Sequence, residues 1–117
     1  MTFVDLRKSI DPLRKKEYRF DLGDYLEFVI SAADIDLVTA VLEQFFGRPA
    51  KPVGAWPSEE LASSVEKFGG IRPDQTLYLY QQNGTLCYAM IWPWADKNSA
   101  TVRISNVKAH AYPSRAG

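Results

Sequence analysis

Apolar residues recur at every second position along residues 18–22 and again along residues 26–30. A period of two places successive side chains on opposite faces of a β-strand, so both segments are predicted strands. Gly23-Asp24 stands between them, which favours a strand pair joined at this point. The alternative is one long bent strand with a Gly-containing bulge.

The length of the connection decides which side chains of the two strands share a face. A two-residue turn at 23–24 would place Leu26 on the face of Asp21, which mixes apolar and charged side chains. A three-residue loop over 23–25 instead pairs Phe20 with Phe28 and leaves one face wholly apolar. We therefore expect the three-residue loop.

A second strand pair is predicted for residues 76–94, where two β-prone runs flank Asn83-Gly84. This dipeptide tolerates the positive φ angles of a two-residue turn, and such a turn fixes the register. The turn makes both faces of the pair apolar. We expect one face to form the core, and it carries Leu77, Leu79, Leu86, Tyr88, Met90 and Trp92. The second face needs a cover that the sequence does not assign, and it carries Tyr78, Tyr80, Cys87, Ala89 and Ile91.

Ser31 and Asp34 have the spacing of a helix capping box, and apolar residues at helical spacing follow them. The predicted helix ends at Gly47, and its stripe consists of Ile35, Val38, Val41, Leu42, Phe45 and Phe46. A second helix is predicted to begin at Ser58, with Leu61, Val65 and Phe68 as its stripe. A last strand is predicted over 101–107, with Val102 and Ile104 pointing inward.

The first residues predict an arm with a turn or two of helix. Asp11-Pro12 resembles a helix start, since proline suits the first helical position. We therefore divide the chain into an arm over 1–16, one domain over 17–107 and a flexible tail over 108–117. The order of elements predicts an α+β two-layer sandwich, in which an antiparallel sheet of four to five strands carries two helices on one face.

Charge is balanced overall, with 14 basic and 14 acidic residues, but it is unevenly distributed. Residues 20–47 hold six acids and no lysine or arginine, whereas residues 1–19 hold six basic residues and three acids. A neutral total argues against a dedicated nucleic-acid binder. The lone Cys87 gives no internal disulfide, and we expect a cytoplasmic protein with no membrane segment.

Few residues are available for catalysis. With one histidine and one cysteine, neither a His-Cys zinc cluster nor a Ser-His-Asp triad has enough members. The sequence predicts no catalytic residue, metal site or cofactor. The remaining candidates for acid–base chemistry are the carboxylates Asp21 and Glu27, both of which we expect on the polar face of their strand pair.

The aromatic residues suggest a binding surface. Tyrosine and tryptophan concentrate binding energy at protein interfaces. The predicted interaction face consists of Tyr78, Tyr80, Ile91, Trp92, Trp94 and Trp56. We therefore expect a small protein-interaction or regulatory module that binds a protein partner or a second copy of itself. The alternative is a small-molecule-binding domain or minor enzyme whose Tyr/Trp-lined pocket is served by Asp21 or Glu27.

Overall fold

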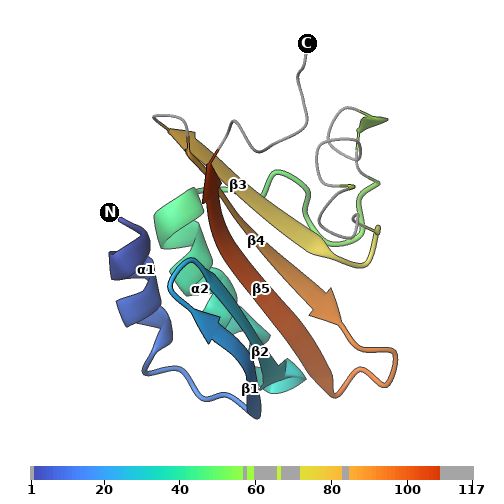
Figure 1. The fold of residues 1–117 in the computed structure, drawn as a ribbon. Helices are drawn as coiled ribbons and strands as arrows, with labels where there is room; N and C mark the ends of the chain where they lie inside the picture. The colour runs from blue at the N-terminus through green and yellow to red at the C-terminus, as the bar shows by residue number, and fades with distance from the viewer. Residues whose placement is uncertain (1, 57, 60–65, 67–71, 83–84, 109–117) are drawn as a thin grey trace.

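A computed structural model of the chain describes residues 2–56, 58–59, 66, 72–82 and 85–108. Its elements are α1 (Phe3–Ile10), β1 (Glu17–Leu22), β2 (Tyr25–Ser31), the 3₁₀ turn η1 (Ala32–Asp34), α2 (Ile35–Phe46), β3 (Thr76–Gln82), β4 (Thr85–Pro93) and β5 (Ser99–Lys108). The strands form one five-stranded antiparallel sheet in the order β1-β2-β5-β4-β3 (Figure 1). The predicted α+β class and antiparallel sheet are confirmed.

The register of β3 and β4 is the one that the sequence predicts. The pairs run without a break from Thr76–Ile91 to Gln82–Thr85, as a two-residue turn requires. The turn residues Asn83 and Gly84 themselves lie outside the described residues. β5 continues the sheet beside β4, so the three strands make a meander.

The turn between β1 and β2 has two residues, so the predicted three-residue loop is wrong. The register pairs are Leu22–Tyr25, Asp21–Leu26, Phe20–Glu27, Tyr18–Phe28 and Glu17–Val29. A β-bulge between Tyr18 and Phe20 shifts the register within β1. The apolar alternation of β1 is therefore split, because Tyr18 lies on the face of Phe28 while Phe20 lies on the face of Glu27.

α2 forms where its apolar stripe predicts. The Ser31 side chain accepts a hydrogen bond from the Ala33 N–H and caps η1, which leads into the helix. Gly47, with φ at 80°, ends it by adopting a backbone conformation that favours glycine. The stripe faces the sheet, since Val38 and Leu42 are fully buried.

α1 contributes side chains to the hydrophobic core. Thr2 caps its start, and Leu6 and Ile10 are fully buried. The predicted helix start at Asp11 is wrong, because Asp11 is the C-cap of α1. Pro12 follows at the helix end because it cannot continue the hydrogen-bonded ladder. Lys15 completes this end by donating from Nζ to the carbonyls of Ile10, Asp11 and Leu13 at 2.7–3.0 Å.

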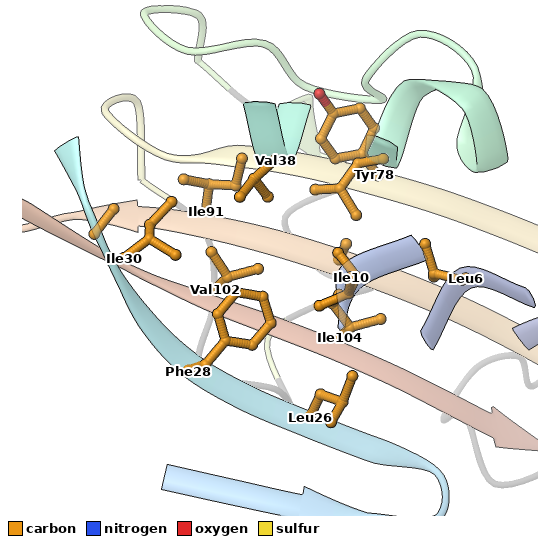
Figure 2. Close-up of a cluster of buried hydrophobic side chains, with 13 residues drawn as sticks. Leu6, Ile10, Leu26, Phe28, Ile30, Val38, Tyr78, Ile91, Val102 and Ile104 are labelled. Carbon is orange, nitrogen blue, oxygen red and sulfur yellow. The ribbon is translucent and has the colours of Figure 1, made fainter. Parts of the chain in front are cut away.

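Both helices pack against the same set of alternate strand residues, which we call the helix face of the sheet (Figure 2). The helix face consists of Leu26, Phe28, Ile30, Tyr78, Ala89, Ile91, Ala100, Val102 and Ile104. We call the other side the opposite face. It carries a second buried cluster of Leu77, Tyr88 and Met90, with Leu79 and Trp92 packed against it.

This arrangement answers the question of which face of the β3–β4 pair the helices cover. The side that carries Tyr78, Ala89 and Ile91, for which the sequence assigns no cover, packs against the helices. The side that carries Leu77, Tyr88 and Met90, which we expect to form the core, is the opposite face. The predicted second helix from Ser58 to Phe68 falls mostly outside the described residues, as does the tail after residue 108. Within the described residues, the helices that pack on the sheet are α1 and α2.

The register of β1 and β2 predicts different losses of stability when Phe28 and Phe20 are replaced by alanine. Phe28→Ala should lower the free energy of unfolding by about 3–5 kcal/mol, because its ring is fully buried on the helix face. Phe20→Ala should cost under about 1 kcal/mol, because its ring is half exposed. Urea unfolding followed by tryptophan fluorescence measures both, and similar losses would contradict the register.

Candidate functional site: the opposite face and the edge strand β1

The opposite face holds a polar cluster built around a buried carboxylate. Glu27 of β2 stands directly across from Arg103 of β5, and only 8% of Glu27 is exposed. The Tyr25 hydroxyl donates to Glu27 Oε1 at 2.6 Å and accepts from Arg103 Nε at 2.9 Å. Arg103 Nε also lies 3.3 Å from Glu27 Oε1. The three side chains thus satisfy one another, as a charged group in a buried place requires.

Two cation–aromatic contacts frame this cluster. The Arg103 guanidinium lies over the Trp92 ring at 4.5 Å from its centroid, and that of Arg19 lies 5.7 Å from the Trp94 centroid. Arg19 Nη1 is also 3.7 Å from Glu27 Oε2, so Glu27 interacts with both cations. Trp94 Nε1 donates to Thr101 Oγ1 at 2.9 Å. Among the described residues, the buried Trp92 Nε1 has no hydrogen-bond partner.

Tyr25 is held in its neutral form. Burial, and then the hydrogen bond to Glu27, raise the pKa of Tyr25 to about 12. The phenol therefore stays a hydrogen-bond donor at neutral pH and is a poor general base. The cluster links β2 to β5 and positions Arg19. Its hydrogen bonds and ion pairs serve to hold the sheet together.

The two candidate carboxylates do not form a pair. The two-residue turn places Asp21 across from Leu26, on the helix-face side, and Glu27 on the opposite face. Asp21 Oδ1 accepts from Arg7 Nη2 of α1 at 2.5 Å, while Glu27 interacts with Arg103. The prediction that both lie on one polar face is wrong, because it rested on the three-residue loop.

The structure separates the six residues of the predicted interaction face. Tyr78 and Ile91 are buried on the helix face, where the Tyr78 hydroxyl donates to Glu43 Oε2 at 3.0 Å. Tyr80 lies at the margin of α2, with its ring 5.6 Å from that of Phe45. Trp92 and Trp94 are half-buried beside the arginines on the other side, and Trp56 is 81% exposed in the segment before β3. These residues do not form one continuous surface.

Among the described residues, three of the exposed large apolar side chains lie together on β1. Tyr18, Phe20 and Leu22 are 45%, 52% and 55% exposed, and every residue of β1 is exposed. β1 is an edge strand that pairs with β2 alone in the sheet order. The apolar alternation of β1 could be predicted from the sequence, but its edge position could not, because edge and central strands differ only in their non-local neighbours.

The other edge of the sheet is partly occupied. Lys51 forms an antiparallel bridge with Leu77 of β3, with N–O distances of 3.1 and 3.0 Å. The buried Lys51 Nζ donates to the carbonyls of Pro52, Pro73 and Gln75, which fixes this segment against β3. β1 carries no comparable bridge within the described residues.

Cys87 lies in the sheet with its side chain buried. Burial raises the pKa of Cys87 to about 12, so the thiol is not a reactive thiolate at neutral pH. Within the part of the chain that the structure describes, no helix is both long and apolar enough to cross a membrane.

Comparison of the chain with protein-family models, with curated proteins and with solved structures gives no match.

The raised pKa of Tyr25 predicts a pH-dependent contribution to stability. Its neutral form is favoured in the folded state, so this contribution is complete below the ordinary pKa of 10.0 and is lost as the pH rises through about 12. Tyr25→Phe should therefore be less stable than the wild type at neutral pH, with a gap that narrows above pH 10. Urea unfolding over this pH range measures the gap, and a constant difference would contradict the assignment.

Proposed function

We propose that this protein is a small protein-interaction module that binds an extended polypeptide segment along the outer edge of β1. The observation that carries the proposal is the row of half-exposed apolar side chains, Tyr18, Phe20 and Leu22, on an edge strand. An edge strand presents backbone N–H and C=O groups to one side, and an added strand can pair with them.

The side chains of β1 give such a segment contacts on both faces of the sheet. On the helix-face side, the Tyr18 ring packs against Phe28 with centroids 6.0 Å apart. On the opposite face, the Phe20 ring packs against Tyr25 at the same separation. The Phe20 ring is therefore held from one side and can receive a second apolar group on the other. The Tyr18 ring also has Lys15 Nζ at 5.3 Å from its centroid.

Among the described residues, the other exposed apolar side chains do not form a comparable row. Val4 lies on α1, Leu37 on α2, Tyr80 on β3 beside Phe45, and Val53 and Trp56 in the segment between α2 and β3. Single exposed apolar residues are ordinary on a protein surface. A row of them on a strand edge favours recognition of another strand.

A phage library of random dodecapeptides, selected on the immobilised protein, tests this proposal. The selected peptides should share an alternating apolar pattern, and Phe20→Lys/Leu22→Lys should abolish their binding because it places charges along the docking edge. Leu37→Lys is the matched control, since Leu37 is 56% exposed on α2 and its substitution should leave binding unchanged.

Hydrogen exchange should locate the bound peptide. The backbone amides of β1 should exchange more slowly when a selected peptide is bound, because strand addition protects outward-facing N–H groups. Failure to enrich any peptide that distinguishes the wild type from the β1 variant would overturn the proposal, as would protection confined to other elements.

A further inference from the structure

We propose that the segment bound by β1 is the β1 strand of a second copy of this chain, in antiparallel pairing about a two-fold axis between Arg19 and Phe20. This inference rests on the proposed function and names the partner. Two-fold pairing of identical edge strands joins two sheets into one and leaves no unsatisfied edge at the junction.

Because of the bulge, the order in which the β1 side chains alternate between the two faces of the sheet is the same in both directions along the strand. Tyr18 and Asp21 lie on the helix-face side, across from Phe28 and Leu26. Glu17, Phe20 and Leu22 lie on the opposite-face side, and Arg19 reaches the same side, where it approaches Glu27 and Trp94. Read from either end, the order of faces along 17–22 is the same.

Residues that stand across from each other in an antiparallel sheet must share a face. With the axis between Arg19 and Phe20, the opposed residues are 17 with 22, 18 with 21, and 19 with 20, and every pair shares a face. An axis on Phe20 would set Tyr18 across from Leu22, and these lie on different faces. The proposed axis is thus the one that pairs all six residues of β1 with matching faces, since an axis on Tyr18 or Asp21 would pair only three of them.

The same register avoids opposing like charges. It places Arg19 across from the uncharged Phe20 of the second copy. It places the two acids, Glu17 and Asp21, across from Leu22 and Tyr18. An axis on Arg19 would oppose two arginines, and an axis on Asp21 would oppose two aspartates, which is destabilising.

Pairing in this register brings the two Phe20 side chains together near the axis. Each lies on the opposite-face side next to the Tyr25 ring of its own chain, and each Leu22 stands across from Glu17 of the other copy. The contact is a single short strand from each copy, so the interface is smaller than the roughly 1,200–2,000 Å² of a stable complex. A weak dimer, with a dissociation constant in the micromolar range, is expected.

Sedimentation velocity from low to high micromolar concentration measures the association. The wild type should pass from monomer to dimer, and Phe20→Lys should stay monomeric because it sets a lysine across from Arg19 of the second copy. Leu37→Lys should dimerise like the wild type. Near-ultraviolet circular dichroism of each variant shows that the fold is retained.

Cysteine crosslinking tests the register, in a Cys87→Ala background that removes the native thiol. Residues 18 and 21 stand across from each other only with the proposed axis, and opposed Cβ atoms are about 4.5–5.5 Å apart. An equimolar mixture of Tyr18→Cys and Asp21→Cys chains should therefore form a mixed disulfide dimer on oxidation. Either variant alone should crosslink far less.

The outcomes separate this inference from the proposed function. A wild type that stays monomeric overturns the second copy as partner, while peptide selection on β1 still decides whether the edge binds other segments. A dimer that survives Phe20→Lys lies elsewhere on the molecule and overturns the inference. A dimer that Phe20→Lys disrupts but that gives no mixed Tyr18–Asp21 crosslink overturns the proposed register.

Discussion

The pairing of β5 with β2 is the contact on which the rest of the structure depends. It joins residues 25–31 to residues 99–105 in an unbroken antiparallel register, although the two strands are far apart in the sequence. Through it, the N-terminal strand pair and the C-terminal meander become one sheet, with α1 and α2 packed on one face. It also sets Arg103 across from Glu27 and so creates the polar cluster of the opposite face.

Features specified by neighbouring residues could be predicted from the sequence. Asn83-Gly84 fixes a two-residue turn, and the register of β3 and β4 follows from that turn by counting. The apolar stripe of α2 and its terminal Gly47 place that helix, because spacing and capping act within a few residues. The inward Val102 and Ile104 of β5 follow from alternation in the same way.

Features that depend on distant residues could not be predicted in this way. The predicted β1–β2 loop places Phe20 and Leu22 on an apolar core face. In the fold both side chains lie on an exposed edge strand, so burial in the core does not determine the length of the loop. Both faces of the β3–β4 pair are apolar, so local pattern could not decide which one α2 covers. Glu27 was expected on a solvated surface, and only the position of Arg103 explains its burial.

The charged residues of β1 make its edge selective. An edge with apolar residues alone would pair with any extended chain, and natural sheets limit this with charges and bulges. β1 has both, since Glu17, Arg19 and Asp21 separate its apolar residues and a bulge interrupts it. A strand that pairs with it must match an interrupted order of faces as well as the order of charges. In the proposed two-fold register, the strand's own sequence meets both conditions.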